Sequence, residues 1–280
     1  MLLGGILLLS IVAAVAVCLG INAFAGWWWL LWLPLSFLGA ALIGIVLALA
    51  FLALAATVVD KEKEQQQDSR FYRTLVHLYI DFALTLCRVK LNTQGLEQAP
   101  KQGRFLLVCN HRHEIDPAIL IKCFPQSQLA FIAKRETKTM PIAGSVMHKI
   151  MCQPINREND REALKTIIKC IRLIQEDAVS IGVFPEGYIK PDRKLHPFRS
   201  GVFKIAQRAN VPIVVCTLRG TSEALPKVLK LQPPEVTMHL VGVIPAEELQ
   251  DATTVQIAEQ VYQMMADDLG PELVHMEENA

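Results

Sequence analysis

The chain has 280 residues, of which 52% are hydrophobic, and its 28 Lys and Arg side chains nearly balance its 27 Asp and Glu side chains. The resulting formal net charge of +1 gives no electrostatic reason to expect a nucleic acid as partner. The charges are unevenly distributed, because residues 1–59 contain no Asp, Glu, Lys, Arg or His. The rest of the chain is long enough for one sizeable core and short for two.

Two long apolar runs open the chain. Residues 2–21 contain twelve Leu, Ile or Val side chains, and residues 35–59 form a second run, so each is long enough to cross a bilayer. We expect the connection between them to be a short loop at the membrane interface, because it combines turn formers with aromatic residues that prefer that region (Asn22, Gly26, Pro34, Trp27, Trp28, Trp29 and Trp32). The runs predict an N-terminal transmembrane hairpin with both ends in the cytoplasm, since Lys and Arg follow the second run. A monotopic hairpin that dips into one leaflet is the alternative.

Residues 60–90 are predicted to be a linker followed by an amphipathic helix over 69–87, where apolar side chains recur at steps of three and four. This helix either packs on the core of the domain or lies on the membrane surface.

From residue 91 to 280 short apolar runs alternate with helical stretches. Strands are expected at 105–108, 129–133, 151–155, 179–184, 211–217 and 236–243, and helices include 160–175, 201–208 and 253–269. This alternation predicts an α/β fold with a mixed, largely parallel sheet covered by helices.

A histidine and an aspartate stand in the turn after the first of these strands. His111 follows the strand, and Asp116 with Pro117 reads as an N-cap followed by proline at the first helical position. If the loop folds back, Asp116 can accept a hydrogen bond from one imidazole nitrogen and leave the other free to take a proton. Taken alone, such a pair is also compatible with a structural hydrogen bond.

Three more blocks stand next to expected strands. Arg157 comes just past one strand, Phe184-Pro185-Glu186-Gly187 ends another and is followed by basic residues, and 211–214 enters a third. Ligands collect beyond the carboxyl ends of strands in open α/β sheets. An arginine fork can grip a phosphate, and a glycine lets a ligand approach the backbone. Each block could instead be a surface ion pair, a turn or a solvated loop, but their order behind a membrane anchor favours a functional site.

In these blocks the chain resembles the membrane-bound glycerolipid acyltransferases typified by 1-acylglycerol-3-phosphate acyltransferase. The likeness covers roughly residues 95–220 and includes Asn110-His111 with Asp116, which matches the NHxxxxD block of that family. The other three blocks match as well, at 154–157, 184–187 and 211–213. The resemblance implies that His111 is the general base and Asp116 its orienting partner. It implies no metal, no cofactor and a set of substrate-binding residues comprising Asn110, Arg157, Pro185, Glu186, Gly187, Lys190 and Arg199.

By this resemblance the protein transfers a long-chain acyl group from acyl-CoA or acyl carrier protein to the free hydroxyl of 1-acylglycerol 3-phosphate, which gives phosphatidic acid. Its partners would be that donor, a lysophospholipid acceptor and membrane lipid, with no nucleic acid, and the catalytic domain would face the cytoplasm from the membrane. We expect residues 1–59 to be the anchor, 60–90 the linker and amphipathic helix, and 91–280 the acyltransferase domain.

The chain departs from the family pattern at several positions. The third block usually continues Thr-Arg-Ser but here reads Tyr188-Ile189-Lys190, so Lys190, Arg193 or Arg199 would have to supply the missing charge. His113 stands where a small hydroxyl residue is usual, and the fourth block has Val215 in place of its second proline. These changes leave another lysophospholipid or a different polar acceptor as alternatives.

Two other classes of function remain open. His111, His113 and Asp116 resemble a metal-binding HxHxD cluster of a hydrolase, although the spacing of the aspartate and the following Pro117 depart from that pattern. A non-catalytic membrane scaffold is the other class, and it predicts that His111→Ala changes nothing measurable.

Overall fold

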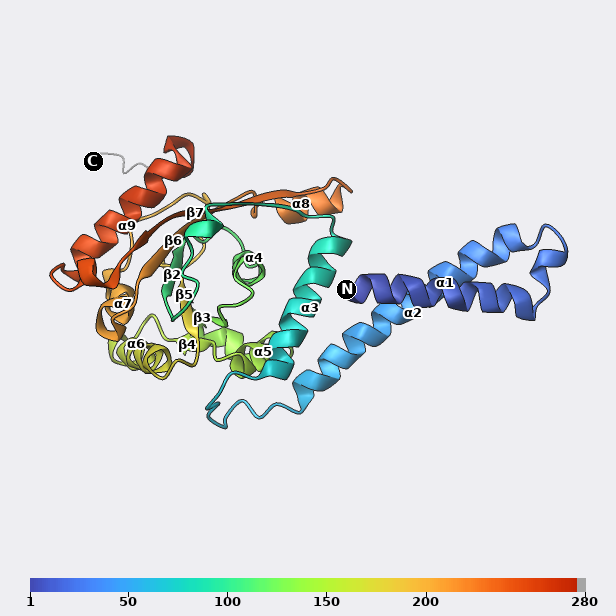
Figure 1. The fold of residues 1–280 in the computed structure, drawn as a ribbon, viewed down its shortest axis with the longest axis horizontal. Helices are drawn as coiled ribbons and strands as arrows, with labels where there is room; N and C mark the ends of the chain where they lie inside the picture. Colours follow the sequence, from blue (N-terminus) through green and yellow to red (C-terminus); the bar gives the residue numbers. More distant parts are fainter. Residues whose placement is uncertain (276–280) are drawn as a thin grey trace.

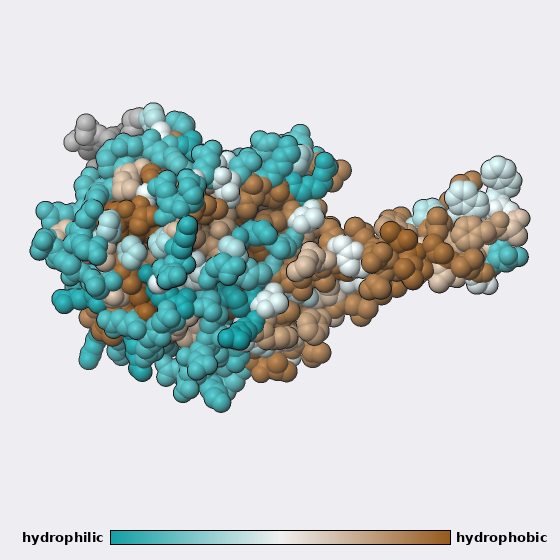
Figure 2. Space-filling model, in the orientation of Figure 1, coloured by the Kyte–Doolittle hydropathy of each residue, from teal (hydrophilic) through white to brown (hydrophobic). Residues whose placement is uncertain are grey.

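The computed structural model describes residues 1–275. Helices α1 (Leu2–Gly20) and α2 (Trp29–Thr57) form an antiparallel hairpin that projects from the rest of the molecule (Figure 1). Both are long and apolar enough to cross a membrane, by length and composition. Figure 2 shows the hairpin as an apolar stalk on a largely hydrophilic body. One face of α1 is buried at every fourth residue, and small side chains at three of these positions let the helices approach closely (Ile6, Ser10, Ala14 and Cys18).

The connection between the two helices is shorter than the sequence predicted. A short 3-10 helix at Ala23–Ala25 turns the chain, and α2 then begins at Trp29. The prediction that Trp29, Trp32 and Pro34 belong to the loop was therefore wrong. Pro34 lies inside α2, where its missing N–H removes a single helical hydrogen bond in a segment that is apolar on both sides.

Helix α3 (Arg70–Leu86) joins the hairpin to the domain. The Tyr72 hydroxyl donates to Ala55 O at 2.7 Å, and the Tyr79 hydroxyl donates to Ala48 O, so both tyrosines hold the carbonyls of α2. The side chains of Tyr72, Leu75 and Phe82 are buried. Of the two placements expected for this helix, packing on the core is the one observed.

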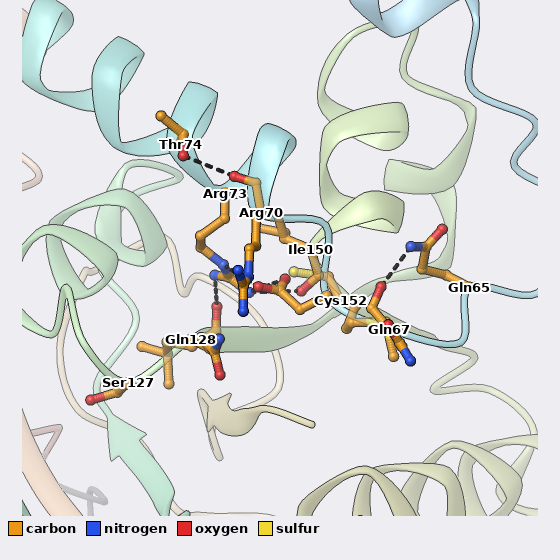
Figure 3. Close-up of polar contacts among 12 residues, drawn as sticks. Gln65, Gln67, Arg70, Arg73, Thr74, Ser127, Gln128, Ile150 and Cys152 are labelled. Carbon is orange, nitrogen blue, oxygen red and sulfur yellow. Dashed lines mark hydrogen bonds and ion pairs between the residues drawn. The ribbon is translucent and has the colours of Figure 1, made fainter. Parts of the chain in front are cut away.

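A buried arginine fastens α3 to the sheet. The Arg73 guanidinium pairs with Asp68 at 2.7 Å and donates to Leu129 O at 2.6 Å and to Ile150 O at 3.2 Å. Figure 3 shows this side chain reaching from α3 toward the backbone next to Gln128 and Ile150. The side chains of Arg73 and Asp68 are only 9% and 6% exposed, so the pair replaces the hydration that both groups lose.

Within residues 1–275 seven strands form one sheet, in the order β1-β7-β6-β2-β5-β3-β4. They are β1 (Lys90–Gln94), β2 (Leu106–Cys109), β3 (Leu129–Lys134), β4 (Gln153–Ile155), β5 (Ser180–Val183), β6 (Ile213–Arg219) and β7 (Glu235–Ile244). The five strands from β6 to β4 run parallel, β7 is antiparallel to β6, and β1 is parallel to β7. The predicted mixed, largely parallel sheet is confirmed. Strand β1 was not predicted, because its sequence KLNTQ is mostly exposed and carries no apolar pattern.

Helices cover both faces of the sheet, with α6, α7 and α9 on one side and α3, α4 and α5 on the other (Figure 1). Their bounds, with that of α8, are α4 (Asp116–Cys123), α5 (Ala143–Lys149), α6 (Asp160–Gln175), α7 (Lys204–Ala209), α8 (Ala224–Leu229) and α9 (Thr254–Leu269). The helix at 160–175 was predicted with its observed bounds, and α9 begins one residue late because Thr253 is its cap in a capping box with Gln256. The helix expected at 201–208 is a 3-10 turn, Ser200–Phe203, followed by α7.

The parallel strands fix which loops can share a site. Strands β2, β4, β5 and β6 point the same way, so their carboxyl ends lie at the same end of the sheet. The loops that follow these strands therefore come together there. The block at 211–213 enters β6 and therefore lies at the opposite end. There Pro212 O accepts a hydrogen bond from Leu106 N at 3.0 Å, which holds the start of β2.

Candidate active site

His111 and Asp116 meet as the sequence predicted. The loop after β2 folds back, and His111 Nδ1 lies 2.9 Å from Asp116 Oδ2. Asp116 is completely buried, whereas 16% of the His111 side chain is exposed. His111 Nε2 has no hydrogen-bond partner in the described part of the chain, so an imidazole oriented through Nδ1 offers its second nitrogen to a ligand.

Asp116 also organises the loop itself. Its Oδ2 accepts hydrogen bonds from Arg112 N at 2.6 Å and His113 N at 2.8 Å, in addition to the contact with His111. The prediction that Asp116 is the N-cap of α4 was wrong by one residue, because Ile115 holds that position. The carboxylate satisfies loop N–H groups instead of helical ones, which ties the shape of the loop to the orientation of the imidazole.

Two stacked phenylalanine rings pack against one face of the His111 imidazole. The ring of Phe184 lies parallel to that of His111, with centroids 4.1 Å apart and an interplanar angle of 16°, and Phe131 stacks on Phe184 at 5.5 Å. Sequence reasoning treated Phe184 only as the end of a strand. Its position follows from the pairing of β2 with β5, which brings Phe184, the residue after β5, close to the loop after β2 that carries His111.

Glu186 lies at the centre of the loops as a hydrogen-bond acceptor. Its Oε1 accepts from His111 N at 2.8 Å and its Oε2 accepts from His196 N at 3.1 Å. Burial raises the pKa of Glu186 to about 7, although both N–H donors favour the charged form. Glu186 was predicted to contact the substrate, but this geometry favours a positioning role in which its carboxylate fixes the backbone of His111.

Asn110 was also predicted to bind substrate, and its amide is engaged within the fold. Asn110 Nδ2 donates to Leu218 O at 3.0 Å, and Asn110 Oδ1 accepts from Leu218 N at 2.7 Å. Asn110 is 2% exposed. The side chain thus joins the end of β2 to β6 and favours a positioning role over a substrate contact.

A cavity of about 320 Å³ lies beside this loop cluster and collects positive charge. Arg157, Arg199 and Lys204 line it together with one carboxylate, Asp160, and apolar side chains that include Phe184. Burial and the neighbouring charge of Arg199 lower the pKa of Arg157. Within residues 1–275 neither the Arg157 nor the Arg199 side chain makes a hydrogen bond or an ion pair, whereas the backbone Arg199 N donates to Pro185 O at 2.9 Å. Unpaired cations gathered beside an apolar wall are suited to an anionic group that carries a hydrocarbon chain.

Pro185 and Gly187 also line this cavity, as expected for the block after β5. Gly187 has a φ of +89°, and a Cβ at this position would lie 3.1 Å from Arg199 Nε. Only glycine adopts this conformation without strain while leaving the guanidinium in place. Lys204, by contrast, was not predicted, because it stands on α7 and no motif marks it.

Lys190 lies elsewhere, paired with its neighbour. Its Nζ donates to the Tyr188 hydroxyl at 2.7 Å and lies 4.0 Å from the centroid of that ring. Arg193 is turned toward the loop after β2, where its Nη1 donates to Arg112 O at 2.7 Å. Of the three cations proposed to replace the missing arginine, Arg199 is therefore the one that lines the cavity.

Comparisons with known proteins bear on these blocks directly. A family model described as Acyltransferase matches residues 90–219. A 1-acyl-sn-glycerol-3-phosphate acyltransferase of Chlamydomonas reinhardtii is 30% identical over 236 residues, which cover 83% of this chain and 68% of that protein. A chloroplastic enzyme of the same name from Brassica napus is 32% identical over 138 residues, and a probable one from Mycoplasma pneumoniae is 32% identical over 165 residues.

The matched segments span 39% of the Brassica protein and 61% of the Mycoplasma protein, and 49% and 58% of this chain. Among solved structures, the crystal structure of the 1-acyl-sn-glycerophosphate (LPA) acyltransferase PlsC from Thermotoga maritima shares the fold, with a TM-score of 0.61 and 21% identity. That likeness covers 79% of this chain and 86% of the Thermotoga chain. The chain belongs to the acyltransferase family that includes the 1-acyl-sn-glycerol-3-phosphate acyltransferases.

Proposed function

We propose that this protein is an O-acyltransferase that moves a long-chain acyl group from a thioester to the free hydroxyl of 1-acylglycerol 3-phosphate, giving phosphatidic acid. One observation carries the proposal. His111 is oriented through Nδ1 by a buried aspartate and keeps Nε2 open, at the end of the sheet where the cationic cavity also lies. The names of the relatives support the choice of reaction.

The chemistry follows from the orientation of the imidazole. An alcohol is a weak nucleophile at neutral pH, and a placed base that removes its proton contributes roughly 10²–10⁴ in rate. His111 Nε2 takes the hydroxyl proton while the oxygen attacks the thioester carbonyl. The C–S bond then breaks, and the proton passes from the imidazolium to the thiolate. Asp116 stabilises the transient positive charge on the ring.

The cationic cavity supports a phosphate-bearing acceptor. Arg157 and Arg199 would hold the phosphate, with Lys204 beside them, and the apolar side chains of the same cavity suit an acyl chain. The donor would be acyl-CoA or acyl carrier protein. The Tyr188–Lys190 pair replaces the usual residues after the third block, so the acceptor headgroup is the part of the proposal that a panel of acceptors has to test.

The hairpin supports a membrane location. The proposed acceptor and product are both lipids that reside in the bilayer, so a domain anchored to the membrane is already next to its substrate. The lysines and arginines after α2 favour a catalytic domain on the cytoplasmic side.

The test uses membranes that contain the wild type or His111→Ala, a labelled acyl thioester as CoA or carrier-protein donor, and a panel of acceptors. The panel comprises lysophosphatidic acid, lysophosphatidylcholine and glycerol 3-phosphate. We expect the wild type to acylate lysophosphatidic acid and His111→Ala to lose at least about 100-fold in rate, because the proton acceptor is gone. His77→Gln, on α3, is the matched control and should keep wild-type activity.

If the wild type prefers another acceptor, the protein is still an acyltransferase, and the different headgroup preference is attributed to Tyr188 and Lys190, which replace the usual residues of the family. If neither donor is used with any acceptor, the enzyme proposal fails and the scaffold alternative takes its place.

Arg157→Ala tests the binding of the phosphate. This variant should mainly raise the apparent KM for the phosphate-bearing acceptor; a loss confined to kcat would place the arginine at the transition state instead.

The geometry favours acyl transfer over metal-assisted hydrolysis at the same loop. His111 Nδ1 is hydrogen-bonded to Asp116, and His113 Nδ1 accepts from Ile115 N at 3.3 Å. Neither Nδ1 atom is therefore free to act as a ligand in a metal site shared by the two histidines. The loop is thus arranged around one imidazole and one carboxylate.

A further inference from the structure

A second cluster of ionisable side chains lies in the loop after Gly187, outside the candidate active site. His196 Nε2 lies 3.0 Å from both carboxylate oxygens of Asp192, and His275 Nδ1 lies 3.2 Å from Asp192 Oδ2. One ligand atom from each of the three residues lies within 4.8 Å of the others. Among residues 1–275 this is the one group of three or more His, Cys, Asp or Glu side chains that comes so close together.

The backbone holds the cluster together from two distant segments. Leu195 N donates to Leu273 O at 2.8 Å and His275 N donates to Leu195 O at 2.9 Å, so the two histidines are carried by paired segments. Asp192 Oδ1 accepts from Lys194 N at 3.1 Å, which orients the carboxylate. The two imidazole rings stack with centroids 4.1 Å apart.

We propose that Asp192, His196 and His275 bind a divalent transition-metal ion, with Zn²⁺ as the representative. Zinc bonds to histidine nitrogen and carboxylate oxygen at about 2.0–2.2 Å in a tetrahedral site. The ligand atoms of such a site are therefore about 3.3 Å apart. The two contacts of Asp192, at 3.0 and 3.2 Å, are close to that separation, and all three ligand atoms lie within 4.8 Å of one another. Binding of the ion requires the two stacked imidazole rings to turn so that both nitrogens face it.

The donor set and its accessibility fit the same assignment. Two imidazoles and one carboxylate suit zinc and its neighbours better than the oxygen-loving Mg²⁺ or Ca²⁺. The side chains of Asp192 and His275 are 36% and 40% exposed, which leaves a path for entry and room for water as a fourth ligand. The side chain of His196, 14% exposed, forms the floor.

The site is built into the loop that supports the candidate active site. His196 N donates to Glu186, and Arg193, next to Asp192, donates to Arg112 O in the catalytic loop. An ion bound here would brace the loop from the outside, without contact with the reacting atoms. The inference goes beyond the proposed acyl transfer and does not depend on it.

The experiment measures metal binding directly, by isothermal titration of ZnCl₂ into the purified full-length protein in lipid nanodiscs. The titration is repeated for His275→Ala and Asp192→Asn. His239→Ala is the matched control, because His239 pairs with Asp268 at 2.6 Å and lies outside the cluster. We expect one equivalent of Zn²⁺, affinity at least about 10-fold weaker in both cluster variants, and no change in the control.

Absence of binding in the wild type, or unchanged affinity in His275→Ala and Asp192→Asn, would overturn the assignment. The second result would point to other donors, such as the partly exposed Cys87 and Cys123. Circular dichroism checks that the variants fold, and His275→Ala keeps the backbone hydrogen bonds that pair its segment with Leu195. A tetrahedral Co²⁺ absorption spectrum that only the wild type and His239→Ala develop would support the site independently.

Discussion

At the scale of single residues, the site depends on two buried carboxylates with different tasks. Asp116 binds the ring of His111 and the N–H groups of its loop, whereas Glu186 binds the backbone N–H of the same histidine. One carboxylate therefore fixes the orientation of the imidazole, and the other fixes the position of its backbone. Each task can be tested with an isosteric amide.

Asp116→Asn should lower kcat by roughly 10²–10⁴, because the amide keeps the size of the side chain but loses the charge that stabilises the imidazolium. KM should change little, since the acceptor does not bind at this residue. Steady-state kinetics in membranes over a range of acceptor concentrations separate the two constants. An unchanged kcat would show that the contact between His111 and Asp116 is only structural.

Glu186 should make stability depend on pH. Its pKa is about 7 when folded and 4.5 as a free side chain, so between these values the folded chain binds a proton that the unfolded chain has lost. The free energy of unfolding should therefore fall as the pH rises from 4.5 to 7, by on the order of 3 kcal/mol, and stay lowered above 7. Urea denaturation across this range, compared between the wild type and Glu186→Gln, measures the difference. Parallel pH dependences of the two proteins would contradict a raised pKa.

At the scale of elements, one helix, α3, holds the apolar N-terminal hairpin and the sheet together. The Tyr72 hydroxyl of α3 donates a hydrogen bond to a carbonyl of α2. The Arg73 guanidinium donates to the carbonyls of Leu129 in β3 and of Ile150, just after α5. Arg73 and Asp68 are almost without solvent, so removal of either leaves the other charge buried and unpaired.

Arg73→Met should lower the free energy of unfolding by about 3–5 kcal/mol, because Asp68 and two backbone carbonyls lose their partner. The double variant Arg73→Met with Asp68→Leu should recover part of this loss, since it removes the stranded charge. Chemical denaturation of both variants in detergent gives the comparison. If the double variant is no more stable than the single one, the cost lies in the carbonyls and not in the carboxylate.

The elements also show what could be predicted from sequence. The apolar strands and α6 follow from composition and periodicity, and the meeting of His111 with Asp116 follows from a strand end and a short loop. The positioning roles of Asn110 and Glu186 could not be predicted. Their partners, Leu218 and His196, are brought to them by strand order and by loop folding, which local sequence does not encode. Strand β1 was missed because its side chains are polar and mostly exposed.

At the scale of the whole molecule, the hairpin can be tested for crossing the bilayer. Trp27 and Trp28 stand at its tip and are 83% and 66% exposed. A spanning hairpin presents this tip to the far side of the membrane, whereas a monotopic one keeps it within a leaflet.

Chymotrypsin, which cuts after aromatic residues, should cleave at the tip when it is added to the side opposite the catalytic domain. Trypsin on that side should leave the chain intact, because residues 1–59 contain no Lys or Arg. Sealed vesicles of known orientation and a gel of the fragments are sufficient. Resistance to chymotrypsin, with a control protein on that side digested, would favour the monotopic arrangement.

The attachment of α3 to both the hairpin and the sheet also constrains how the protein finds its acceptor. Two tyrosines tie α3 to α2 and one arginine ties α3 to β3, so the linker between α2 and α3 cannot work as a free hinge. An anchored hairpin would then hold His111 at a constant height above the lipid headgroups. The encounter becomes a lateral search in two dimensions, and its rate follows the mole fraction of acceptor in the membrane. Dilution of the acceptor with inert phospholipid should slow turnover, even when its amount in the whole sample is unchanged.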